Sequence, residues 1–131
     1  MDSYKILKQI VPTTSWAEAY YVPEPAAVEV GPGGIVEVAP KAVSLNTQTL
    51  VTSIIVCGYA TGSYSIALKS TQGGSDPVEP LNLLFHEKAI TANTTEVLSP
   101  GLTLGPGNSL WVKETDAGTH VGITIMGIEI T

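Results

Sequence analysis

The chain has 131 residues, a length that fits one domain with a hydrophobic core of its own. Twelve acidic residues outnumber six lysines and arginine is absent, which argues against binding to nucleic acids or to anionic membranes. Only 14% of the residues are charged and 44% are hydrophobic, so much of the surface must be weakly charged. Interface cores are depleted in charge, and this composition therefore favours a subunit of an oligomer or assembly.

No targeting segment is expected. The first eleven residues lack the apolar stretch of a secretory leader, and no run reaches the length of a membrane span. We therefore expect the protein to be made in a cytoplasm and to stay soluble. Its single cysteine, Cys57, cannot form an internal disulfide and lies in an apolar run, where we expect a buried thiol.

Two short strands are predicted before residue 23. Residues 4–11 (YKILKQIV) have a spacing that suits a short helix or a strand, but Pro12 after two β-branched residues favours an extended chain. Residues 16–22 (WAEAYYV) form the second predicted strand, which ends at Pro23.

A hairpin is predicted next, in the near-palindrome VEV–GPGG–IVEV of residues 28–38. If Val30 pairs with Ile35, then Val28 pairs with Glu37 on the same face, and Glu29 pairs with Val36 on the other. Neither face is wholly apolar, so residues 24–46 are expected to project as an arm outside the core.

The remainder of the chain is predicted to be strands and turns. Runs of β-branched residues alternate with turns rich in Gly, Pro, Asn and Asp, as in a β-sandwich. Residues 50–57 (LVTSIIVC) are apolar on both faces, which indicates a central strand or one that lies against a neighbouring subunit. We predict an all-β fold over residues 1–131, a jelly-roll-like antiparallel β-sandwich of about 8–10 strands plus the extra hairpin. The predicted strands of this part are residues 50–57, 63–69, 81–90, 94–98, 109–113 and 119–130.

No catalytic, metal or cofactor site is predicted. His86 and His120 lie in different segments, without the additional cysteines or clustered carboxylates that a zinc site needs. The twelve acidic residues allow many carboxylate pairs, but no pair stands out as the acid and base of a glycosidase. An enzyme is therefore the least favoured class.

Aromatic and hairpin residues are the candidate interface. Trp16, Tyr20 and Trp111 have the size and amphipathic character of interface anchors. Because Trp111 alternates with Leu110 and Val112, it faces away from them, toward the core or toward a subunit interface. The hairpin contributes the other candidate interface residues, which are Val28, Val30, Ile35 and Val36.

Six short segments follow one another along the chain: Tyr21-Val22-Pro23, TSIIVC (52–57), YSIALKS (64–70), I-x-A-x-x-T (90–95), L-x-L-x-x-G-x-x-L-x-V (102–112) and G-x-E-I (127–130). The order of these segments resembles that of small virion structural proteins of tailed bacteriophages. The resemblance covers about residues 47–131 and a short N-terminal piece, while residues 24–46 depart from it as an insertion.

The resemblance implies a non-enzymatic virion component without a cofactor. Such a protein decorates or cements a capsid by binding the major capsid protein or other virion proteins, often as a homo-oligomer such as a trimer or a dimer. The alternative is a tail, baseplate or fibre component, including a carbohydrate-binding module that uses exposed aromatics on host-surface glycans. No functional residue transfers, because the shared pattern is scaffold.

Overall fold

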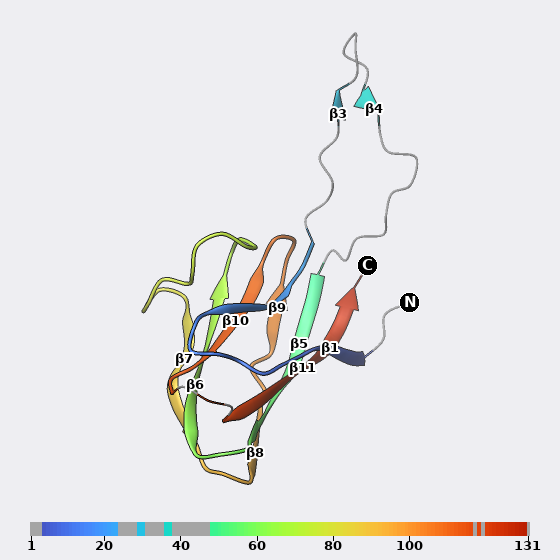
Figure 1. The fold of residues 1–131 in the computed structure, drawn as a ribbon. Helices are drawn as coiled ribbons and strands as arrows, with labels where there is room; N and C mark the ends of the chain where they lie inside the picture. The colour runs from blue at the N-terminus through green and yellow to red at the C-terminus, as the bar shows by residue number, and fades with distance from the viewer. Residues whose placement is uncertain are drawn as a thin grey trace.

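The computed structural model describes residues 4–23, 29–30, 36–37, 48–116, 118 and 120–130. These residues form strands and turns without a helix, and two antiparallel sheets pack face to face (Figure 1). The predicted β-sandwich is confirmed.

Most strands lie where the sequence places them, and one short strand, β9, was not predicted. The strand at residues 94–98 has the predicted bounds, and residues 4–11 are extended rather than helical. The strands are β1 (Tyr4–Ile10), β2 (Ala17–Tyr21), β3 (Glu29–Val30), β4 (Val36–Glu37), β5 (Gln48–Gly58), β6 (Gly62–Lys69), β7 (Leu83–Ile90), β8 (Thr94–Leu98), β9 (Leu102–Leu104), β10 (Ser109–Glu114) and β11 (Val121–Ile130).

The strand order is that of a jelly roll. One sheet has five strands in the order β1-β11-β5-β8, with β9 also paired to β5, and the other has four in the order β2-β10-β6-β7. Along the chain the pairs are nested: β1 with β11, β2 with β10, β5 with β8 and β9, and β6 with β7. Nested antiparallel pairs divided between two sheets are the arrangement of a jelly roll, and β8 and β9 together occupy one strand position.

The predicted hairpin is present, but its predicted register is wrong by one residue. β3 and β4 pair Glu29 with Glu37 and Val30 with Val36, which leaves five connecting residues instead of four. The alternating Val and Glu residues offer no wholly apolar face that would fix the register, so the sequence pattern could not select it. Val28 and Ile35 lie outside the described residues, as does most of the segment 24–46. The projecting arm therefore stays a prediction.

The hydrophobic core lies between the two sheets. The five-stranded sheet contributes Ile54, Val56 and Ile125, and the four-stranded sheet contributes Ile66 and Leu110, all fully buried. Burial of each such side chain stabilises the fold by roughly 1.5–3 kcal/mol relative to an exposed position. Outside the bulges, alternate residues of the long strands point into this layer and leave the intervening ones on the outer faces.

A bulge in β5 exchanges the two faces of this strand. Met126 pairs with Ser53 and Gly127 pairs with Val51, so Thr52 has no partner in the register. The extra residue shifts the alternation by one position. Consequently Cys57 points outward and is exposed, and the prediction of a buried thiol is wrong.

Tyr64 carries a hydroxyl group that its surroundings do not satisfy. The side chain is fully buried in the core, and its hydroxyl finds no hydrogen-bond partner among the described residues. Burial, and then the negative charge of Glu96, raise the pKa of Tyr64 from 10.0 to about 12. The folded state therefore favours the neutral phenol.

At neutral pH we expect the free energy of unfolding of Tyr64→Phe to equal that of the wild type or to exceed it by up to about 1 kcal/mol. The substitution removes a buried hydroxyl group that has no hydrogen-bond partner. Since the folded-state pKa of Tyr64 lies above the unfolded value, wild-type stability is fully present below about pH 10 and falls as the pH rises toward 12. The variant should lose less over this range. Urea unfolding at a series of pH values measures both effects, with Tyr59→Phe at a 77% exposed position as the control. A loss of stability at neutral pH would contradict the expectation.

Candidate interaction surfaces

The outer face of the five-stranded sheet consists of the side chains that point away from the four-stranded sheet. Paired strand positions lie side by side on one face, so the register determines its membership. The rows across this outer face are Tyr4–Ile128–Leu50–Thr103, Ile6–Met126–Ser53, Gln9–Thr124–Ile55–Val97 and Gly122–Cys57–Thr95, with Ile130–Gln48 at one end.

None of these described side chains is charged. The four charged residues on the same strands point elsewhere: Lys5 pairs with Glu129, and Glu96 pairs with Lys88 of β7 at 2.8 Å. Lys8 lines a groove beside β2. Because β5 bulges at Thr52 and β1 has a second irregularity between Ile6 and Lys8, these placements do not follow from simple alternation.

Several apolar side chains on the outer face are open to solvent. Tyr4 and Ile6 of β1 are 53% and 54% exposed, and Val97 of β8 is 62% exposed. Side-chain hydrogen bonds with Thr52 and Ser53 lower the pKa of Tyr4, which places its ring across the sheet toward β5. This combination of exposed apolar groups without charges is unusual for a surface that meets only water.

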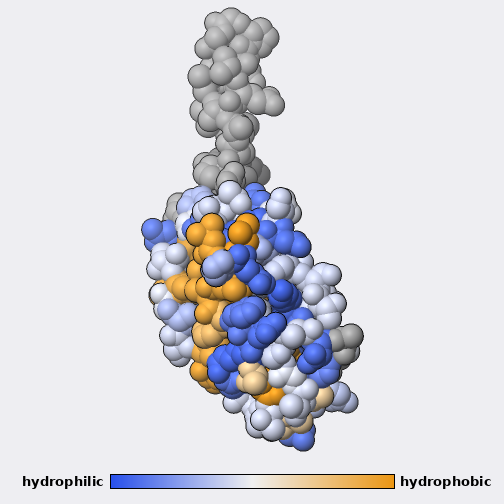
Figure 2. All heavy atoms as spheres, turned by 90° about the vertical axis from the view of Figure 1, so that its left-hand side faces the viewer, coloured by the Kyte–Doolittle hydropathy of each residue, from blue (hydrophilic) through white to orange (hydrophobic). Residues whose placement is uncertain are grey.

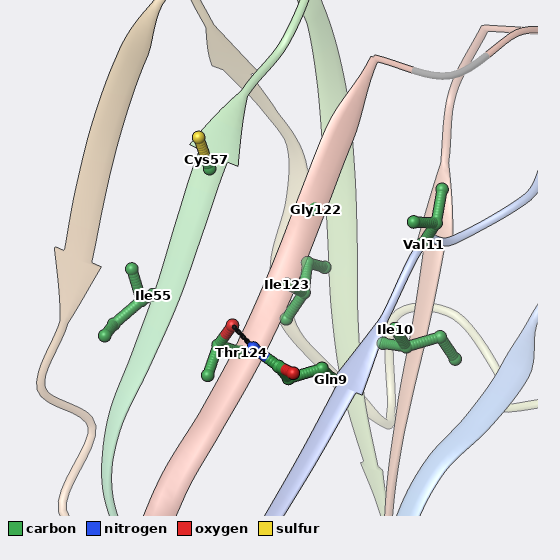
Figure 3. A pocket seen from close by; sticks show the side chains of 8 residues that line it. All are labelled: Gln9, Ile10, Val11, Ile55, Cys57, Gly122, Ile123 and Thr124. Atoms are coloured by element: carbon green, nitrogen blue, oxygen red, sulfur yellow. Dashed lines mark hydrogen bonds between the residues drawn. The ribbon is translucent and has the colours of Figure 1, made fainter. Parts of the chain in front are cut away.

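A groove of about 290 Å³ lies in this outer face (Figure 3). It crosses β11 at Gly122, where no heavy atom lies within 4 Å of the position a Cβ atom would take. The Gln9 amide donates a hydrogen bond to Thr124 Oγ1 at 3.4 Å beside it. The groove is mostly apolar, and its lining residues are Gln9, Ile10, Val11, Ile55, Cys57, Gly122, Ile123 and Thr124.

A second exposed apolar surface lies at β7, the last strand of the four-stranded sheet. Val78, Leu81 and Leu84 are 59%, 81% and 37% exposed. Figure 2 looks onto the side of the molecule where Figure 1 places β7, and it shows an elongated hydrophobic band bordered by hydrophilic residues. We call Val78, Leu81 and Leu84 the β7 surface.

Trp111 is buried by its own chain rather than by the opposite sheet. It is 6% exposed and lies outside the core cluster, on the outer side of β10. The indole Nε1 donates to Ser109 Oγ at 2.8 Å, and the Lys69 ammonium lies 4.8 Å from the ring centroid. Lys69 in turn donates to the carbonyls of Gly73 and Ser75, which hold the connection after β6 beside Trp111. Its interface role stays a prediction.

The two other predicted aromatic anchors have different surroundings. Lys113 lies 4.7 Å from the ring centroid of Trp16 and hydrogen-bonds Glu79 at 2.9 Å, an interaction that lowers the pKa of Glu79. The Tyr20 hydroxyl hydrogen-bonds Thr49 Oγ1 at 2.9 Å and donates to Glu129 Oε2 at 2.7 Å, and burial raises the pKa of Tyr20. Of the predicted hairpin residues, Val30 and Val36 pair with each other, and the interface role of the hairpin residues and of the aromatic anchors stays a prediction.

A buried carboxylate that sequence reasoning missed fixes the connection between β10 and β11. The side chain of Glu114 is fully buried, and its Oε1 accepts hydrogen bonds from the backbone amides of His120 and Val121, each at 2.9 Å. Glu114 Oε2 lies 3.4 Å from His120 Nδ1. In the sequence Glu114 belongs to a polar run, KETDAGT, with no signal that distinguishes it from a solvated turn.

Comparison of the chain with protein-family models, with curated proteins and with solved structures found no match in any of the three. Within the described ranges, no three His, Cys, Asp or Glu side chains are placed to hold a metal ion. The same residues include no helix long and apolar enough to cross a membrane. The strand order and the two exposed apolar surfaces are the features from which a function can be inferred.

Proposed function

We propose that the chain is a non-enzymatic structural protein of a tailed-phage virion. Its role is that of a decoration or cement protein, made in the host cytoplasm, which binds and stabilises the lattice of the major capsid protein. The observation that carries the proposal is the jelly-roll strand order joined to apolar, weakly charged outer surfaces. Jelly rolls recur in viral capsid domains, but the fold alone does not define a function, so the surfaces carry the greater weight.

The β7 surface is suited to the capsid contact. Leu84 lies in the edge strand β7, and Val78 and Leu81 lie in the connection just before it. Burial of each of these exposed side chains stabilises a complex by roughly 1.5–3 kcal/mol before the loss of mobility on binding. The nearby Lys88 and Glu96 already neutralise each other. A contact of this modest strength becomes firm when it is repeated over a symmetric lattice, because linked copies bind with high effective concentration.

Co-sedimentation with capsids tests the proposal. The capsids should be assembled from the major capsid protein of the phage that encodes this chain. We expect saturable binding and a capsid that melts at a higher temperature. Leu84→Glu should weaken binding at least tenfold, because an unpaired carboxylate would be buried in the contact. Tyr59→Glu, at an exposed position outside the β7 surface, is the matched control. The absence of binding, or equal binding by both variants, would contradict the proposal.

A glycan-binding component of a tail or fibre is the second candidate. The observation that favours it is a groove of about 320 Å³ beside β2, where the 47% exposed ring of Tyr21 lies near Lys8, Glu18 and Glu129. An aromatic ring beside polar groups is the arrangement that stacks on a sugar and binds its hydroxyls. Saturable binding of host polysaccharide that Tyr21→Ala abolishes would favour this function over capsid decoration.

A further inference from the structure

We propose that a second copy of the chain packs on the outer face of the five-stranded sheet. The two copies are related by a two-fold axis, and the groove at Gly122 receives apolar side chains of the partner copy. This inference goes beyond the proposed function, because it concerns self-association and does not depend on whether the protein binds a capsid. Four observations support it: the charge of the chain, the composition of the face, its shape and its extent.

Charge favours a second copy as the occupant. The chain has a net charge of −6, so two copies repel each other wherever their acidic surfaces meet. The outer face of the five-stranded sheet has no charged residue among its described positions, because Lys5, Lys8, Glu96 and Glu129 all point elsewhere. A contact there buries no ion from either copy. A partner recognised through opposite charge would gain nothing from this face.

The composition of the face also fits an interface. Leu50, Ile55 and Ile128 line its middle rows, while Tyr4 and Val97 lie at its margins. In a strand whose outer face meets solvent, apolar residues on the inner face normally alternate with polar residues on the outer face. Here β5 has apolar residues on both faces, although only its inner face packs against the other sheet in the described part of the chain.

The shape of the face is complementary to itself. A two-fold contact uses one patch twice, so the patch must contain both a projection and a hollow. Val97, which is 62% exposed, forms the projection, and the groove at Gly122, which its strand partner Ile55 lines, is the hollow (Figure 3). Facing sheets pack about 10 Å apart with interdigitated side chains, which is a distance that lets the projection of one copy enter the hollow of the other.

The extent of the face is sufficient for a stable dimer. Four strand positions about 4.8 Å apart, and a central strand of about 33 Å, define roughly 600 Å² on each copy. Two such faces bury about 1,200 Å² in total, which lies within the range of specific interfaces.

Sedimentation equilibrium of the full chain under reducing conditions tests the inference. We expect a reversible dimer for the wild type and at least a hundredfold weaker association for Ile55→Glu, because each copy would bury an unpaired carboxylate. Gly122→Val should weaken association at least tenfold, since it fills the hollow, while the open space around Gly122 lets the monomer fold normally. Leu84→Glu on the β7 surface is the control that should dimerise like the wild type. Circular dichroism verifies the fold of each variant.

The thiol of Cys57 provides a second measurement, because it is exposed in the single chain and lies on the proposed interface. Its reaction rate with a maleimide should fall as the wild-type concentration rises, and should stay high at every concentration for Ile55→Glu. Three results would overturn the inference. These are a wild type that remains monomeric at every concentration, a dimer in which Cys57 reacts at the monomer rate, and a dimer that Ile55→Glu does not weaken.

Discussion

Replacement of Gly127 by alanine is expected to destabilise the protein by about 3 kcal/mol or more. A Cβ atom at this position would lie well inside van der Waals contact of the Leu50 carbonyl oxygen, and 3.1 Å from both the Leu50 carbonyl carbon and Leu7 Cδ1. Leu50 belongs to β5, which is paired with β11, so its backbone cannot move away without loss of ladder hydrogen bonds. Overpacking costs about 1–3 kcal/mol, and each lost hydrogen bond adds about 1 kcal/mol.

Gly122→Ala is the matched control in the same strand. No heavy atom lies within 4 Å of a Cβ atom at Gly122, so alanine meets no obstacle there. Glycine weakens a strand interior, and alanine should therefore leave the free energy of unfolding within about 0.5 kcal/mol of the wild type or raise it. Urea unfolding, done at a concentration where the chain is monomeric, measures both changes. Equal losses for the two variants would refute the role assigned to the close approach of Leu50.

Glu114→Ala is expected to destabilise the protein by about 3 kcal/mol. The change leaves the backbone amides of His120 and Val121 without their acceptor, and an unsatisfied buried donor costs about 1–3 kcal/mol. The lost buried side chain adds a cavity at the start of β11. For a chain of this length the change should lower the melting temperature by roughly 10 °C.

Glu114→Gln separates the hydrogen bonds from the charge. Glutamine keeps one acceptor oxygen that can accept hydrogen bonds from both amides. The free energy of unfolding of Glu114→Gln should therefore fall by only about 1 kcal/mol. Amide hydrogen exchange gives a local measurement, in which the His120 and Val121 amides exchange faster in Glu114→Ala than in Glu114→Gln. Asp116→Ala, at an exposed position in the same connection, should leave both measurements unchanged. If glutamine were as damaging as alanine, the stabilisation would have to come from the charge instead.

The strands could be predicted from the sequence because most of them are long, rich in β-branched residues and bounded by turn residues. β9 was missed because its three residues, between Pro100-Gly101 and Gly105-Pro106, are too few to show alternation. Cys57 was expected to be buried because residues 50–57 are apolar on both faces, but it lies on the outer face of β5 and is exposed. A strand with apolar residues on both faces also gives no signal of the bulge at Thr52.

The candidate surfaces could be predicted only in part. The apolar character of residues 50–57 on both faces was the single sequence signal that the outer face of β5 needs a partner. The other residues of this outer face come from β1, β8 and β11. Only the strand register shows that the charged residues of these strands point away from the outer face. Glu114 was missed because burial of a carboxylate depends on two amides that the fold brings to it, not on neighbouring residues in the sequence.

The nested strand order also determines when the protein can fold during its synthesis. β1 pairs with β11 alone among the described strands, so Tyr4 must wait for Ile128 to be made. At about 5–20 residues per second, the ribosome needs roughly 4–14 seconds to proceed from the end of β5 to the end of β11. During that interval β5 lacks its longest partner, and its apolar side chains remain open to chaperones or to other nascent chains. Neighbouring ribosomes on one mRNA would therefore bring incomplete chains together while the apolar side chains of β5 are still exposed.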